Sequence, residues 1–135
     1  MTKIENARIF YDGIFANETV TVTAQTTLAK GTVLGRNKDK ELVAFTTDNN
    51  VAPVAETETA PAVEGFTTEP IYILAEALPN TTKSKATFTA RVFDGGTVNK
   101  DRIIFTKTAD KTDVAVLDAL HRNGFTLVPV QDLAE

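Results

Sequence analysis

Strict alternation of side-chain type is the feature of this sequence that most restricts its fold. Between residues 19 and 23 threonine alternates with valine, and between residues 86 and 93 apolar residues alternate with threonine and arginine. A period of two places successive side chains on opposite faces of a strand, so each segment predicts a half-buried strand. Threonine, which favours strands, is frequent elsewhere too. The sequence therefore predicts a mainly β fold.

Other segments predict further strands and the turns between them. Residues 28–35 and 42–45 are short apolar segments separated by a polar run, a pattern typical of a hairpin. Residues 70–79 form the most apolar run, and their length, flanking prolines and β-branched content favour one buried strand. Asp94-Gly95-Gly96 predicts a turn at the end of the strand that covers residues 86–93.

One helix is predicted, at residues 113–123. Its apolar residues recur at helical spacing, Asp110 or Thr112 can cap its start, and Gly124 can cap its end. Residues 125–130 then predict a strand, which a proline near its end confines to a sheet edge or terminates, because proline cannot donate to a ladder. The predicted fold class is thus mainly β with one C-terminal helix.

With 135 residues, the chain has the size of one domain. Residues 4–15 contain several large apolar side chains, and an end segment of this kind is either tied into the core or kept for a partner. We therefore expect an N-terminal arm or strand at residues 1–24, followed by a single β-rich domain at residues 25–135. Within that domain, the polar composition of residues 46–70 predicts a long surface loop.

The composition excludes several classes of protein. The chain has no cysteine, so disulfides and cysteine-based metal or redox sites are excluded. Its net charge of -4 argues against nucleic acid or an anionic membrane as the main partner, since both attract clustered Lys and Arg. The N-terminus lacks a signal-peptide pattern and no apolar stretch is long enough to span a membrane. We therefore expect synthesis in a cytoplasm and no membrane partner.

No catalytic, metal or cofactor site is predicted. Ser84 and His121 are the only serine and histidine, and they lie in a polar turn and on the predicted helix, without a pattern that joins them in a catalytic triad. One histidine is too few for a zinc site. The oxygen-rich residues 48–50 and 94–101 lack the spacing of a calcium loop, and residues 31–35 lack the Lys-Ser or Lys-Thr of a phosphate-binding loop.

Charge is divided unevenly along the chain. Between Lys40 and Lys83 there is no Lys or Arg while seven acidic residues accumulate, and from Lys83 to Lys111 the balance is basic. Opposite patches on one small domain suit self-association or docking on a charged surface. The alternative is a loop and a sheet face whose charges only keep the protein soluble.

Five segments follow one another in a recognisable order. They are residues 28–35, residues 40–45, residues 71–77, residues 86–98 with the Asp94-Gly95-Gly96 sequence, and residues 117–128. This order, over roughly residues 25–130, resembles the lambda-type head decoration proteins, or capsid cement proteins, of tailed bacteriophages. The resemblance implies a β-clip-like fold with an extended N-terminal arm. It also implies a homotrimer, made in the host bacterial cytoplasm, that sits on the outer surface of the expanded head and stabilises it.

The resemblance further implies a binding protein with no enzymatic activity, whose partner is the major capsid protein of the phage head. In such proteins the N-terminal segment adds a strand to the capsid protein, which combines main-chain hydrogen bonds with side-chain anchors. The candidate capsid-binding residues are Ile4, Ile9, Phe10, Tyr11, Ile14 and Phe15. Two alternatives remain: a virion tail, fibre or adhesin subunit, and a small enzyme that uses carboxylates or threonine.

Overall fold

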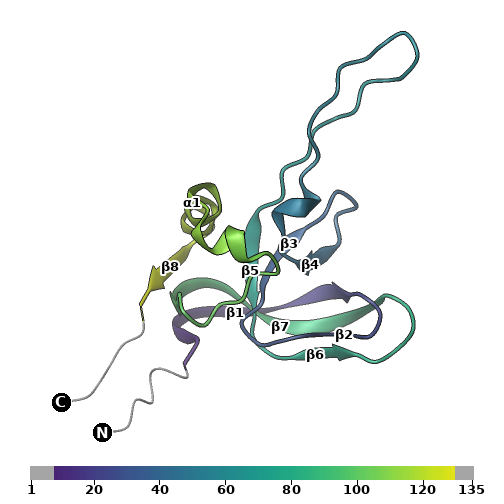
Figure 1. Ribbon diagram of the computed structural model, residues 1–135. Coiled ribbons are helices and arrows are strands. Elements are labelled where there is room, and N and C mark those ends of the chain that lie inside the picture. The colour runs from purple at the N-terminus through teal and green to yellow at the C-terminus, as the bar shows by residue number, and fades with distance from the viewer. Residues whose placement is uncertain (1–7, 130–135) are drawn as a thin grey trace, which may run out of the picture.

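Two long antiparallel strands, β1 (Phe10–Val22) and β7 (Ala86–Asn99), form the longest pairing in the computed structural model, which describes residues 8–129 (Figure 1). They belong to a six-stranded sheet of order β1-β7-β5-β3-β4, in which β8 pairs in parallel with the end of β7. The strands β2 and β6 form a separate two-stranded sheet. The remaining elements are β2 (Thr26–Leu28), β3 (Val33–Arg36), β4 (Leu42–Ala44), the 3-10 helix η2 (Thr47–Asn49), β5 (Pro70–Leu74), β6 (Leu78–Asn80), the 3-10 helix η3 (Thr108–Thr112), α1 (Val114–Arg122) and β8 (Phe125–Val128).

The prediction of a turn at Asp94-Gly95-Gly96 is wrong, because β7 continues through these residues and pairs with β1 on both sides of them. Gly13 lies opposite Gly96, and both have positive φ angles, 145° and 135°. The register shifts by one residue beside this pair, which leaves Asp94 without a partner on β1. Glycines in this position allow a bulge inside a continuous strand, and the long pairing with β1 overrides the local turn preference.

Both faces of the central strands are buried, so that consecutive residues on β3, β5 and β7 point into two different cores. One core lies under α1 and contains Val33, Phe45, Ile73, Phe93, Val98, Ile103, Val116, Leu120 and Phe125. The other contains Val20, Val22, Leu34, Leu42, Leu74, Leu78, Ala90 and Val92. The half-buried strand predicted at residues 86–93 is therefore confirmed, with its apolar residues turned inward as expected.

The predicted helix is confirmed as α1, and Gly124 follows it with a φ of 95°, as expected for a C-terminal cap. Its N-cap is Asp113, whose side chain accepts a hydrogen bond from the Ala115 N–H, so the two predicted caps are wrong. The buried Asp110 carboxylate instead accepts hydrogen bonds from the N–H and the hydroxyl of Thr47. Asp110, which sequence spacing predicted as a helix cap, thus makes a long-range contact with Thr47 instead.

The predicted single strand at residues 70–79 is divided into β5 and β6, which lie in different sheets. The division lies at residues 75–77, where Glu76 accepts a hydrogen bond from the Arg91 N–H of β7 at 2.7 Å. The hairpin predicted from residues 28–35 and 42–45 is confirmed as β3 and β4. The last predicted strand is present as β8 up to Val128, whereas Val130 lies outside the described residues.

The predicted long loop contains a projecting β-hairpin, residues 51–66, which we call the ribbon (Figure 1). Val51 pairs with Phe66 and Val54 with Val63 through reciprocal main-chain hydrogen bonds of 2.7–2.9 Å. A turn closed by the Ala60 carbonyl and the Thr57 N–H forms the tip. The ribbon is exposed, as predicted for a surface loop, and two isolated antiparallel bridges hold its two sides together.

The sequence predicts an N-terminal arm or strand at residues 1–24 and a domain at residues 25–135. The strand of the first segment, β1, pairs with β7 and belongs to the same sheet as the strands of the second segment. The end of β1 buries Val20 and Val22 completely in the second core, between β7 and the β3–β4 hairpin. Each such side chain contributes about 1.5–3 kcal/mol by burial. The strand part of this segment is therefore structural.

The Gly13–Gly96 contact generates a test of the β1–β7 pairing. In Gly96→Ala the new Cβ would collide with the Asp12 carbonyl oxygen and lie 2.6 Å from the Gly13 Cα, at an unfavourable positive φ. We expect a loss of about 3 kcal/mol in the free energy of unfolding, measured by chemical denaturation. Gly95→Ala is the matched control, because its Cβ would have only ordinary contacts of 3.5 Å or more. Equal stability of the two variants would contradict the proposed role of this contact.

Candidate functional site

The six residues predicted to bind a capsid have different environments. Ile4 lies outside the described residues. Ile9 and Phe10 are partly buried and pack against the core under α1, and the Phe10 ring lies 4.6 Å from that of Phe93. The Asn99 side chain and N–H also hold the chain here, by donating to the carbonyls of Arg8 and Ile9. Ile9 and Phe10 thus belong mainly to the core.

Ile14 and Phe15 are the exposed members of this group, with 67% and 38% of their surface accessible. Phe15 is held in place on one side by edge-to-face contacts with Phe10 and Phe93, at 5.5 and 5.1 Å between ring centroids. The Arg91 guanidinium lies 4.3 Å from the centre of the same ring, a cation–π contact. Phe15 is therefore an ordered apolar anchor, whose exposed edge lies next to the freely accessible Ile14.

β1 has an unpaired outer edge. On β7 the Arg91 carbonyl accepts a hydrogen bond from the Ala75 N–H, so the main-chain groups of Arg91 point away from β1. In an antiparallel ladder these groups alternate in direction, so the main-chain groups of the residues before and after Arg91 point toward β1. The alternation of an antiparallel ladder then turns the main-chain groups of Asn17 and Thr19 away from β7. Both residues are exposed, and within residues 8–129 no strand pairs with this edge.

Tyr11 is the residue that the first register shift of β1 leaves unpaired. Its hydroxyl oxygen is buried and has no hydrogen-bond partner among the described residues. A buried hydroxyl without a partner loses its hydration and gains nothing in exchange, which destabilises the fold by about 1–3 kcal/mol. The hydroxyl of Tyr11 thus lowers the stability of the fold.

Asn80 fixes the end of β1 to the segment between β6 and β7. This buried amide donates to the carbonyls of Val22, Thr23 and Ser84 at 3.0–3.1 Å. Its oxygen accepts from the N–H and hydroxyl of Thr82 at 3.0 and 2.6 Å. Sequence reasoning did not identify this residue, although Asn followed by two threonines is a pattern typical of a side-chain-capped turn.

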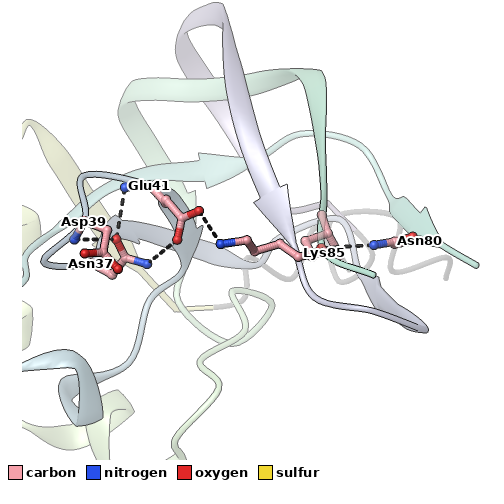
Figure 2. Close-up of polar contacts among 6 residues, drawn as sticks. Asn37, Asp39, Glu41, Asn80 and Lys85 are labelled. Atoms are coloured by element: carbon pink, nitrogen blue, oxygen red, sulfur yellow. Dashed lines mark hydrogen bonds and ion pairs between the residues drawn. The ribbon is translucent and has the colours of Figure 1, made fainter. Parts of the chain in front are cut away.

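An ion pair next to this network joins the β3–β4 turn to the start of β7. Lys85 Nζ lies 2.8 Å from Glu41 Oε2, and Asn37 donates to Glu41 Oε1 at 2.9 Å. In Figure 2 the Lys85 side chain extends toward Glu41, while Asn80 lies on the opposite side of Lys85. The hydrogen bond from Lys85, and then that from Asn37, hold the pKa of Glu41 below its ordinary value. The same pair raises the pKa of Lys85.

Several surface grooves lie on the described part of the chain, including the following two. The first, of about 380 Å³, lies between the end of β1 and β4 and has the Glu41–Lys85 pair among its lining residues. The second, which we call the α1–β8 groove, is larger, about 550 Å³. Its lining residues are Lys100, Asp101, Ile103, Phe105, Lys111, Thr112, Leu117, His121 and Leu127. Apolar side chains thus line its centre and mostly basic ones surround them.

Ser84 and His121, the only serine and histidine of the chain, lie in different parts of the fold. Ser84 lies before β7 and uses its carbonyl to accept from Asn80, whereas His121 lies on α1 at the α1–β8 groove. Among residues 8–129, no three His, Asp or Glu side chains are grouped so that they could hold a metal ion. No helix in this part of the chain is long and apolar enough to cross a membrane.

The unpartnered hydroxyl generates one prediction. Tyr11→Phe keeps the ring and removes the buried oxygen, so we expect no loss, or a gain of about 1 kcal/mol, in the free energy of unfolding. The control is Tyr72→Phe, which removes a hydroxyl that donates to Glu18 at 3.3 Å and should lose about 1 kcal/mol. A larger loss for Tyr11→Phe than for Tyr72→Phe would show that the Tyr11 hydroxyl has a stabilising partner.

The ion pair generates a second prediction, on pH dependence. Folding lowers the pKa of Glu41, so the ion pair stabilises the fold fully at a pH above the ordinary pKa of glutamate. This stabilisation is lost as the pH falls through the lowered pKa. Lys85→Ala should raise the pKa of Glu41, measured by NMR titration, although Asn37 retains part of the lowering. Lys83→Ala, at a neighbouring exposed lysine, should leave it unchanged. An unchanged value in Lys85→Ala would contradict the assignment.

No protein-family model matches this chain, and neither does any of the curated proteins. Its function is therefore inferred from the described surfaces themselves. The surface that best suits a partner combines the unpaired edge of β1 with the exposed side chains of Ile14 and Phe15.

Proposed function

We propose that this protein is a capsid decoration protein of a tailed bacteriophage. It forms a homotrimer with a fold of the β-clip kind, binds the outer surface of the expanded head, and stabilises the shell without catalysing a reaction. The mainly β fold with one C-terminal helix and the order of its segments support this proposal. Its place is the outer surface of the virion, and its partner is the major capsid protein.

The observation that carries the proposal is the exposed, unpaired edge of β1 next to two apolar anchors. Unpaired main-chain N–H and C=O groups on a strand edge are a template for another strand. Asn17 and Thr19 offer such groups on the same strand as Ile14 and Phe15. A capsid segment that pairs with this edge would gain main-chain hydrogen bonds and cover both side chains. The sheet shared with the capsid protein would thus extend through β1.

The geometry also supports attachment at low entropic cost. Ordering a free segment costs roughly 1–2 kcal/mol per residue, whereas burying an apolar side chain returns about 1.5–3 kcal/mol. Phe15 is already held by Phe10, Phe93 and Arg91, so little freedom is lost when it is covered. Three linked copies raise the effective concentration of the second and third contacts. Weak single contacts can therefore give lasting attachment.

The alternative of a tail, fibre or adhesin subunit is supported by one feature, the projecting ribbon, which suits contact between successive subunits (Figure 1). An end-to-end assembly would give filaments or a broad range of masses, whereas a decoration protein gives a closed trimer. Size-exclusion chromatography with light scattering separates the two.

Removing residues 1–23 is not a clean test of capsid binding, because it deletes β1 and with it two buried valines. Ile14→Glu is cleaner, since the side chain is 67% exposed. We expect unchanged stability and binding to expanded heads that is weaker by about tenfold or more, as for a central anchor residue.

The matched control for this prediction is Val114→Glu, at an apolar residue of α1 that is 70% exposed. This variant should bind heads as the wild-type protein does, which shows that an added surface charge alone is harmless. Co-sedimentation with expanded and unexpanded heads measures both. Wild-type affinity of Ile14→Glu for expanded heads would contradict the proposed binding surface.

A further inference from the structure

The ribbon, residues 51–66, leaves the body of the protein between η2 and β5 and projects from it as a double strand (Figure 1). Two isolated main-chain bridges hold its strands together, and nearly all of its side chains are exposed. Val54 and Val63, which face each other across the ribbon, are 53% and 44% accessible. A two-stranded hairpin that packs on nothing is only marginally stable in water. The exposed Val54–Val63 pair is therefore a small apolar surface that contact with a partner would bury.

The ribbon is also acidic. Glu56, Glu58 and Glu64 are exposed, and none of them has an ion-pair partner among residues 8–129. No Lys or Arg lies between residues 41 and 82 to balance them. The chemistry of the ribbon is therefore an apolar pair flanked by carboxylates, and its partner should present apolar surface surrounded by cations.

The α1–β8 groove has this complementary chemistry. Its centre is lined by Phe105, Leu117 and Leu127, which are partly buried against the core. Lys100 and Lys111 also line the groove; both are exposed, and neither has an ion-pair partner in the described part of the chain. Asp101 is the one carboxylate among the lining residues, so the two lysines leave the groove basic. Its volume of about 550 Å³ accommodates several side chains.

The ribbon and the groove of one molecule do not face each other. In Figure 1 the ribbon points away from β8, and its tip is the part of the fold farthest from it. We propose that the ribbon of one copy docks in the α1–β8 groove of a second copy, with Val54 and Val63 on the apolar centre and the glutamates near Lys100 and Lys111.

This contact is head-to-tail, because a projecting element meets a different surface of the next molecule. Such contacts form a ring when the rotation between copies closes, and a filament when it does not. The inference deepens the proposed homotrimer and rests on that self-association, but it does not depend on capsid binding. The β1 edge stays available for the capsid protein, since Ile14 and Phe15 belong to neither the ribbon nor the groove.

Charge reversal with compensation in the same chain tests the contact. In E56K/E58K/E64K the altered side chains are exposed, so folding, checked by circular dichroism, should be unchanged. We expect the oligomer seen by light scattering to fall to the monomer mass, with a dissociation constant raised by more than about tenfold. Adding K100E/K111E to this variant should restore the oligomer. Asp118→Lys, on the exposed part of α1 outside the groove, is the control and should assemble normally.

A second measurement uses the absence of cysteine from the chain. With E58C on the ribbon and K111C at the groove in one chain, a short bis-maleimide cross-linker should join successive copies into trimers or ladders. Each single-cysteine variant should give dimers at most. The proposal is overturned by a wild-type protein that is monomeric, by wild-type assembly of E56K/E58K/E64K, or by failure of K100E/K111E to restore it.

These outcomes are distinct from those that test capsid binding. Ribbon-dependent assembly of a protein that does not bind expanded heads would overturn the decoration function alone. Binding to heads by a trimer that is insensitive to charge reversal on the ribbon would overturn the ribbon contact alone.

Discussion

The antiparallel pairing of β1 with β7 holds the rest of this structure together. β7 pairs with β1 along its length, with β5 near its middle and with β8 at its end, so three parts of the chain depend on one strand. Val92 and Phe93, which are neighbours on β7, enter different cores. The pairing is continuous only because Gly13 and Gly96 allow the two backbones to approach closely. Without these glycines the bulge could not form at this point of the ladder.

The same pairing creates the surfaces that we propose to be functional. It places β1 at the end of the sheet, where no strand within residues 8–129 pairs with its outer edge, and it brings Phe10 and Phe93 into edge-to-face contact with Phe15. Recognition through such an edge uses main-chain groups and apolar contact, and neither requires a reactive side chain. A chain with one serine, one histidine and no cysteine is suited to this kind of task.

The distribution of charge becomes meaningful only in three dimensions. Some acidic residues of the basic-free stretch form ion pairs within the fold, as Glu41 does with Lys85 and Glu69 with Arg122. Those of the ribbon form none with the described residues, and the ribbon points away from β8 (Figure 1), whose Leu127 lines the α1–β8 groove. The net charge of -4 therefore combines neutralised pairs with two separated surfaces of opposite sign, which suits head-to-tail assembly.

Features that depend on nearby residues could be predicted from the amino-acid sequence. Alternation predicted the strand at residues 86–93, and spacing with Gly124 predicted α1, because periodicity and capping act within a few residues. The exposure of Ile14 and Phe15 was not predictable, since it depends on what packs against each face of β1, and those contacts come from residues distant in sequence. The continuation of β7 through Gly95 and Gly96 depends on long-range contacts, because pairing across the sheet outweighs a local turn preference. The tertiary structure also divided residues 70–79 between two sheets and aligned Val54 with Val63 in the ribbon, contacts between residues that sequence periodicity does not relate.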